Sequence, residues 1–373
     1  MRIVIAPDKF KGSLPAAEVA AALAAGLRAA LGPAELITIP VADGGDGTVD
    51  AAVAAGFARV PVTAAGPTGE PVTTSYARRG GLALVELATV CGLERLPGGR
   101  LRPLASSSYG VGEVMRAALA AGAGELVLAV GGSASTDGGA GMLQALGARV
   151  TGPDGASLGR GGGTLGDVTG LDLTGLDPAV GQAQITLAAD VQNPLTGPDG
   201  AAEIFGPQKG ADPGQIAALD AGLRRWAALV AEATGHDWSQ APGAGAAGGV
   251  GFAALAVLGA QRRSGIDMIL ELVGFEAALD GADLVVTGEG SLDTQSLAGK
   301  APIGVARAAA ARGVPVIAVA GRSTLTAAQA RAAGITAIHP LTGLEPDLAR
   351  SMTGAASLLE RIARDQLAPW SRA

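Results

Sequence analysis

Cysteine, histidine, lysine, asparagine and aromatic residues are all scarce in this chain of 373 residues. The single cysteine, Cys91, can form neither an internal disulfide nor a thiolate metal cage, and its apolar surroundings indicate a buried, inert thiol in a reducing compartment. Aromatic residues make up only 3%, and the formal net charge of -7 leaves no broad basic surface for a phosphate backbone. The sequence therefore disfavours nucleic-acid binding.

Long apolar runs are also lacking. Only a short apolar stretch precedes Pro7 and Asp8, which is too little for the apolar core of a signal peptide. The longest uncharged stretch, residues 238–261, is interrupted by Pro242 and six glycines, and its apolar part is well short of the roughly 20 residues that span a membrane. We therefore expect a cytoplasmic protein without a membrane span.

The signatures of several enzyme classes are missing as well. Neither His236 nor His339 lies near a nucleophile elbow, which leaves a Ser-His-Asp hydrolase without support. No HExxH motif or Cys/His ligand set occurs, so catalytic zinc is disfavoured, and the residues around Lys300 do not form a Walker A motif. Two GxGxxG matches, at 161–166 and 243–248, do not follow predicted strands and are weak signals in a chain with 59 glycines.

Short apolar runs, each followed by a glycine- or aspartate-bearing turn and an alanine-rich helical pattern, recur along the chain. This succession predicts strand, loop and helix units and an α/β fold with a mainly parallel sheet. Strands continuous in Val, Ile, Leu and Ala are expected where helices cover both sheet faces. Strands are predicted within residues 3–8, 36–45, 125–132, 185–190, 283–290 and 314–321, and helices at 15–31, 46–56, 138–147 and about 302–312.

The length suggests two domains. The two ends of the chain show the cleanest strand and helix alternation, so we expect residues 1–60 plus 284–373 to form one parallel, layered domain. Residues 61–283 would then form a second α/β domain inserted into the first. Two consecutive domains divided near residue 200 are the alternative that the pattern alone leaves open.

Lysine occupies only four of the 27 basic positions, namely Lys9, Lys11, Lys209 and Lys300. All four lie in loop-like sequence near glycine or proline, where an ammonium group is a compact donor for a phosphate oxygen. Chance placement on exposed loops is the alternative. The only asparagine, Asn193, follows Asp190 closely and could help to hold a metal ion or a substrate hydroxyl, or could form a turn before Pro194.

Carboxylates and hydroxyls gather among glycines in the loops that follow the predicted strands. The carboxyl ends of parallel strands meet at one edge of a sheet, where α/β proteins bind ligands. Each residue alone could be a helix N-cap, but together they suit phosphate and Mg²⁺ chemistry, and hence phosphoryl transfer. The loop residues are Asp8, Asp43, Asp46, Ser133, Ser135, Thr136, Asp137, Asp190, Asn193, Glu289 and Asp293.

The chain resembles the glycerate kinase family that includes the bacterial glycerate 2-kinases, over essentially its whole length. The matching segments, in order, are IAPDKFKGSL, ADGGDGTVD, GPTGEPV, SSSYGVGE, GGSASTDGGAGMLQALG, DVQNPL, FGPQKGA, GAAGGVG and TGEGSLDTQSLAGKAPIGVA. This resemblance implies ATP-dependent phosphorylation of D-glycerate with Mg²⁺, giving 2-phosphoglycerate or 3-phosphoglycerate. It also implies one flavodoxin-like, Rossmann-like domain and a separate inserted α/β domain, with the active site in the cleft between them.

If the chain phosphorylates D-glycerate as the resemblance implies, we expect the following roles for these residues. Asp190 would be the base or a metal ligand at the acceptor hydroxyl. The expected catalytic residues are Asp190, Lys9 and Asn193; the substrate-binding residues are Asp8, Lys11, Ser106, Ser107, Ser108, Asp43 and Lys209; the nucleotide-binding residues are Gly44, Gly45, Gly132, Ser133, Asp137, Gly288, Gly290 and Lys300; and the metal ligands are Glu289 and Asp293.

Two other classes of function remain open on the sequence. A nucleotide-linked oxidoreductase would use the parallel sheet and bind NAD(P), and a non-catalytic sugar-acid binding protein would keep the glycine loops. The expected partners are the small molecules D-glycerate and ATP, without nucleic acid or membrane, and a homodimer is left open.

Overall fold

The computed structural model describes residues 1–368 and 370, and the chain divides into two compact units. Unit 1 comprises Met1–Asp43, Asp50–Gly56 and Gly265–Ala373, and unit 2 comprises Gly44–Val49 and Phe57–Ser264. The later boundary between the units lies after Ser264, and not after residue 283 as expected from the sequence. The physical reason is that α10 (Gly265–Leu272) and α11 (Phe275–Ala278) bury apolar side chains in a core of unit 1.

Within the described residues, unit 1 contains a five-stranded sheet in which every pairing is parallel. Its strands in spatial order are β13 (Ala337–Pro340), β12 (Val316–Ser323), β11 (Leu284–Leu292), β1 (Arg2–Pro7) and β2 (Glu35–Thr38). Numbered by their order along the chain within this unit, the strands run 2-1-3-4-5 from the β2 edge. This is the flavodoxin-like, doubly wound order, and its switch point lies between β1 and β11.

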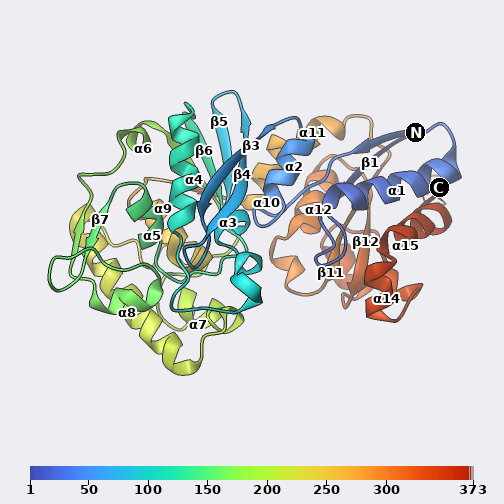
Figure 1. Cartoon of the computed structure of the whole chain (residues 1–373). Coiled ribbons are helices and arrows are strands. Elements are labelled where there is room, and N and C mark those ends of the chain that lie inside the picture. The colour runs from blue at the N-terminus through green and yellow to red at the C-terminus, as the bar shows by residue number, and fades with distance from the viewer. Residues whose placement is uncertain (369, 371–373) are drawn as a thin grey trace. The chain divides into compact units, whose positions relative to one another are not determined.

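Helices cover both faces of this sheet. Ile3 and Ile5 of β1 face a core shared with α1 (Ala16–Leu31) and α15 (Ala355–Ile362), which lie side by side (Figure 1). Val4 and Ala6, which point to the opposite face, pack in a core with α12 (Ala301–Ala311). Shorter helices of this unit are α13 (Ala327–Ala332) and α14 (Leu348–Thr353), and α2 (Thr48–Ala54) begins in unit 2 and ends in unit 1.

Unit 2 has a mixed six-stranded sheet within the part of the chain that the structure describes. The parallel strands are β5 (Leu82–Glu86), β6 (Glu125–Ala129), β9 (Gln184–Ala188) and β10 (Gln261–Arg263). The antiparallel strands β4 (Pro71–Arg79) and β3 (Ala58–Ala65) extend it on the β5 side. A separate small sheet pairs β7 (Arg149–Thr151) with β8 (Gly170–Asp172).

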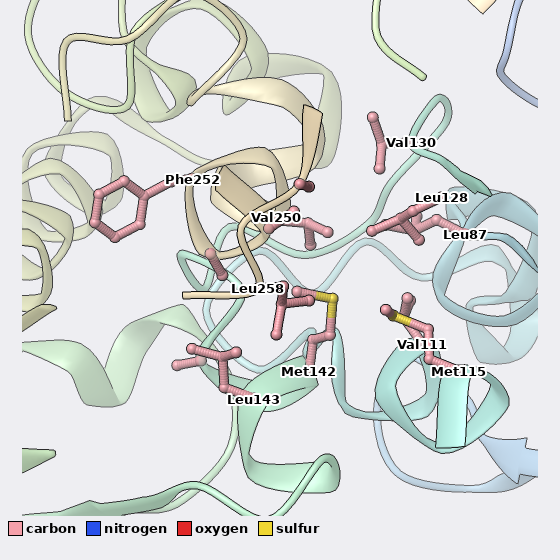
Figure 2. Packing of buried hydrophobic residues seen from close by; sticks show 14 of the residues in the cluster. Leu87, Val111, Met115, Leu128, Val130, Met142, Leu143, Val250, Phe252 and Leu258 are labelled. Carbon is pink, nitrogen blue, oxygen red and sulfur yellow. The ribbon is translucent and has the colours of Figure 1, made fainter. Parts of the chain in front are cut away.

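The core of unit 2 lies between its six-stranded sheet and the helices that pack against it. Figure 2 shows Leu128 of β6 near Met115 of α4 (Tyr109–Ala120), Met142 of α5 (Ala140–Ala145) and Val250 of α9 (Val250–Ala256), all within one buried cluster. The helices of this unit are α3 (Ala88–Cys91), α4 (Tyr109–Ala120), α5 (Ala140–Ala145), α6 (Pro178–Gln182), α7 (Ala201–Phe205), α8 (Pro213–Thr234) and α9 (Val250–Ala256).

The six predicted strands and four predicted helices are confirmed, with small shifts at their ends. The antiparallel pair β3 and β4 was not predicted. Its turn is closed by a 2.6 Å hydrogen bond from the Gly66 amide to the Glu70 carbonyl, and Gly69 takes a positive φ of 100° there. The alternation of apolar and polar residues on both sides of this glycine-containing turn was the available signal.

Candidate active site

The switch point of unit 1 brings together two carboxylates from distant parts of the sequence. Pro7 at the end of β1 pairs with Gly288 of β11, and the Asp8 amide donates a 2.8 Å hydrogen bond to the Gly288 carbonyl. Asp8 therefore comes directly after β1, and Glu289 lies one residue beyond the paired Gly288, in the carboxyl-terminal half of the adjacent parallel strand β11. This is the edge where ligands bind in doubly wound sheets.

Asp8 is only 5% exposed. Burial, with smaller contributions from the negative charges of Asp43 and Glu289, raises its pKa to about 7 against the opposing effect of Lys9. The Lys9 amide donates to Asp8 Oδ1 at 2.6 Å, and Lys9 Nζ lies 3.7 Å from the same oxygen. Desolvation thus outweighs the ion pair, and Asp8 can change its protonation state near neutral pH.

Glu289 is the second buried carboxylate of this group and is 6% exposed. Ser296 Oγ donates to Glu289 Oε1 at 2.5 Å, and Lys300 Nζ lies 3.8 Å from Oε2. Burial raises the pKa of Glu289, while Ser296 and Lys300 lower it and the charges of Asp43 and Asp293 raise it. The Glu289 carboxylate therefore sits among both acidic and basic groups.

Asp293 organises the turn that carries Ser296. Its Oδ1 accepts hydrogen bonds from the Gln295 amide at 2.9 Å and the Ser296 amide at 3.2 Å. This places Asp293 before a short 3₁₀ turn, Ser296–Ala298, which leads to Lys300 at the start of α12. The predicted metal ligands Glu289 and Asp293 are thus linked through Ser296.

The buried carboxylates of unit 1, Asp8 and Glu289, are groups that could hold a divalent cation such as Mg²⁺. Asp43 and Glu289 raise the pKa of Asp8, and a divalent cation near them would relieve this repulsion. Among the described residues, no group of three or more His, Cys, Asp or Glu side chains is arranged as a metal cage. Mg²⁺ does not need one, because it usually takes one or two protein carboxylates and completes its shell with water and phosphate oxygens.

The predicted nucleotide-binding glycines of β11 allow close backbone packing. A Cβ atom on Gly288 would lie 2.1 Å from the Val319 carbonyl oxygen of β12. A Cβ atom on Gly290 would lie 3.2 Å from the amide nitrogen of Lys11, in the turn after β1. Both glycines therefore allow close backbone packing on this side, and their contacts with the nucleotide stay a prediction.

Unit 2 has a second polar group, centred on Asp137. Its Oδ2 accepts from the Ser108 amide at 2.8 Å, Ser108 Oγ at 2.9 Å and Ser107 Oγ at 3.2 Å, and its Oδ1 accepts from the Gly139 amide at 3.2 Å. Burial raises the pKa of Asp137, and the hydrogen bonds from Ser108, Gly139 and Ser107 oppose that shift. Asp137 thereby ties the serine run before α4 to the loop before α5.

Lys209 holds the same loop from another direction. Its side chain is buried, and Nζ donates to the Ser135 carbonyl at 2.5 Å, Ser133 Oγ at 3.0 Å and Thr136 Oγ1 at 3.3 Å. Burial lowers the pKa of Lys209 to about 7, and the negative charge of Asp137 opposes the shift. The structure thus shows this lysine inside unit 2, supporting a loop.

The glycine loop 43–47 depends on a residue that sequence analysis missed. Glu86, at the end of β5, accepts hydrogen bonds from the Gly47 amide at 3.1 Å and the Val49 amide at 2.7 Å. A Cβ atom on Gly131 would lie 2.4 Å from the Gly45 Cα, so this loop also packs on the residues after β6. The signal for Glu86 was a carboxylate at the end of a strongly apolar run, LALVE.

Five other residues with predicted roles lie in loops, where local contacts or backbone conformation describe them. Asp190 lies two residues after the end of β9 and is half-buried, and the Asn193 side chain donates to the Asp199 carbonyl at 2.9 Å. Ser106 Oγ donates to the Arg102 carbonyl at 2.8 Å. Gly44 and Gly132 adopt positive φ angles of 82° and 71°, which favour glycine there.

No helix of the described residues is long and apolar enough to cross a membrane.

Comparison with known proteins gives full-length matches. A model described as the glycerate kinase family matches residues 3–371. A glycerate kinase of Bacillus subtilis strain 168 is 42% identical over 368 residues, 98% of this chain and 96% of that protein. A glycerate 2-kinase of Escherichia coli K12 is also 42% identical over 368 residues, 98% of this chain and 97% of that protein. A crystal structure described as glycerate kinase 2 of Salmonella typhimurium LT2 has a TM-score of 0.83 and 41% identity, and covers 99% of both chains.

Proposed function

The chain belongs to the glycerate kinase family and is a kinase, and we propose that it transfers the γ-phosphoryl group of ATP to a hydroxyl of D-glycerate. The observation that carries this proposal is the position of Asp8 and Glu289 beside Lys9 and Lys300 at the switch point of the unit 1 sheet. Carboxylates for a divalent ion and ammonium groups for phosphates are the parts that phosphoryl transfer needs.

In unit 1, we assign the phosphates of ATP to the switch-point edge. Lys300 and Lys9 would donate to phosphate oxygens, and Glu289, with Asp293 behind it, would hold Mg²⁺. When bound, Mg²⁺ would neutralise negative charge on the phosphates. Asp8, with a pKa of about 7, would be partly protonated without the cation and would be ionised beside bound Mg²⁺.

In unit 2, we assign the acceptor to the loops after β6 and β9. Asp190 would take the proton from the attacking hydroxyl, and Asn193 would steady the same loop through its bond to the Asp199 carbonyl. The Ser107 and Ser108 hydroxyls are already engaged by Asp137, so their contribution would be to fix the shape of the loop.

For the product, we propose 2-phosphoglycerate, because the similar Escherichia coli protein is named a glycerate 2-kinase. The alternative is 3-phosphoglycerate. The two products differ in which carbon carries the phosphate, and ³¹P NMR of the reaction mixture distinguishes them by their coupling to protons. We also propose a cytoplasmic location, where ATP is available. We further propose a homodimer, which light scattering of the purified protein would test.

The direct test mixes purified protein with ATP, Mg²⁺ and D-glycerate and follows ADP release. We expect ADP formation that requires D-glycerate and is abolished by chelating the Mg²⁺. Parallel samples contain NAD(P) in place of ATP, to test for oxidation of the acid. No ADP above the background of the acceptor-free sample would overturn the proposed function.

A further inference from the structure

Unit 2 contains a cavity that none of the assignments above uses. Its volume is about 600 Å³, within the size range of small-molecule sites. The walls come from the β3–β4 turn and from the segment before the serine run, and the lining residues are Thr68, Glu70, Pro97, Gly98, Arg100, Arg102 and Ala105.

The register of the hairpin places this cavity at the edge of the unit 2 sheet where the parallel strands β5, β6 and β9 end. Strand β4 runs antiparallel to β5, with Arg79 opposite Leu82 and Ala77 opposite Leu84. The start of β4, and the turn before it, therefore lie beyond the carboxyl end of β5. The loops after β5, β6 and β9 leave the sheet at that same edge, because these three strands are parallel.

The two walls are fastened to each other and to the serine run. The Ser107 amide donates to the Pro67 carbonyl at 2.8 Å, which joins the turn to the following segment. The Arg102 carbonyl accepts from both the Ser106 amide at 2.9 Å and Ser106 Oγ at 2.8 Å. The turn and the segment that line the cavity are therefore held together by hydrogen bonds, and Ser107 Oγ also donates to Asp137 at 3.2 Å.

The lining residues offer two kinds of polar partner. Arg100 and Arg102 are exposed, and among the residues that the structure describes neither guanidinium forms an ion pair with a carboxylate. Thr68 Oγ1 donates to Glu70 Oε2 at 2.6 Å, and this bond lowers the pKa of Glu70, so its carboxylate stays ionised and can only accept hydrogen bonds.

We propose that this cavity recognises the acceptor acid, with Arg100 and Arg102 binding its carboxylate and Glu70 and Thr68 binding the hydroxyl that is not phosphorylated. A guanidinium group matches a carboxylate through paired N–H donors, which an ammonium group cannot reproduce. An ionised Glu70 accepts from a hydroxyl and repels a second acid group. Together, the two arginines, Glu70 and Thr68 would select a hydroxy acid. This inference rests on the proposed function.

The test compares Arg100→Ala/Arg102→Ala with a matched control, Arg95→Ala, which changes an exposed arginine of the same segment outside the cavity. We expect the double variant to raise the KM for D-glycerate by about 10-fold or more while the KM for ATP stays unchanged. Arg100→Lys/Arg102→Lys should recover only part of the loss. Circular dichroism and thermal melting would verify that the variants fold.

A binding measurement separates this inference from the proposed function. Calorimetric titration with D-glycerate, without ATP, should show binding to the wild type and to Arg95→Ala, and at least about 10-fold weaker binding to the double variant. Unchanged D-glycerate binding and KM in the double variant would overturn the inference even if the enzyme is an active kinase. A wild type that binds D-glycerate through the arginines but releases no ADP would overturn the proposed function alone.

Discussion

Asp8 couples the stability of unit 1 to pH. Its pKa rises from 3.8 to about 7 on folding, so between these values the folded chain binds more protons than the unfolded chain. The stability contributed by protonated Asp8 is therefore lost as the pH rises from about 4 to 7. We expect Asp8→Asn to be more stable than the wild type at pH 8, by on the order of 1 to 4 kcal/mol, and to lose this advantage near pH 4.

Urea unfolding at both pH values checks this expectation. The control is Asp172→Asn at an exposed site, where hydrogen bonds from Thr174 lower the pKa of Asp172, so the amide should slightly destabilise the chain at pH 8. A difference between Asp8→Asn and the wild type that does not change with pH would contradict the argument.

Lys209 is expected to act through the loop that it supports. Lys209→Met keeps the aliphatic length but leaves Ser133, the Ser135 carbonyl and Thr136 without their donor. Unsatisfied buried acceptors cost about 1 to 3 kcal/mol, so we expect a loss of stability of that size. Lys300→Met, at a side chain with 37% exposure, should leave stability unchanged and instead raise the KM for ATP. Equal melting temperatures for the two variants would argue against this difference.

Asp190 is the residue proposed to accept the proton of the attacking hydroxyl. Asp190→Asn cannot accept that proton, so kcat should fall by at least about 100-fold while the KM for ATP changes little. Asp199→Asn, an exposed aspartate in the same loop, serves as the control and should keep most of the activity. A near-normal kcat for Asp190→Asn would remove the residue from the role of base.

At the level of elements, the apolar strands were predictable and the polar supports were not. Strands β1 and β11 are recognisable in the sequence because both faces of each strand are buried, which requires a continuous apolar run. The sequence also placed carboxylates at their ends. It could not show that Glu86 and Lys209 turn inward to hold glycine loops, because this depends on contacts between residues distant in sequence.

The packing of the loop 43–47 on the residues after β6 gives a prediction at this scale. A Cβ atom on Gly131 would lie 2.4 Å from the backbone of Gly45, and no flexible side chain can yield there. Gly131→Ala should therefore cost about 1 to 3 kcal/mol of stability and lower the activity with it. Gly124→Ala is the matched control, since a Cβ atom there has nothing within 4 Å. Urea unfolding of both variants would show the contrast, and equal midpoints would exclude this close contact.

At the level of the whole molecule, the two units are expected to bind different ligands. The proposals assign nucleotide phosphates to the ends of β1 and β11 in unit 1, and the hydroxy acid to the cavity in unit 2. A ligand that binds only the folded state stabilises its own unit, by about 2.7 kcal/mol at 100 times its dissociation constant. Each ligand should therefore slow amide hydrogen exchange mainly in the unit that binds it.

Hydrogen exchange read by mass spectrometry can measure this difference. ADP with Mg²⁺ should slow exchange at residues 8–11 and 288–300, and D-glycerate alone should slow it at residues 66–70 and 97–108. Because both effects are measured on one wild-type protein, neither depends on a variant that fails to fold. Protection by the nucleotide confined to unit 2, or by D-glycerate confined to unit 1, would reverse the assignment of ligands and with it the roles given to Lys300 and Arg102.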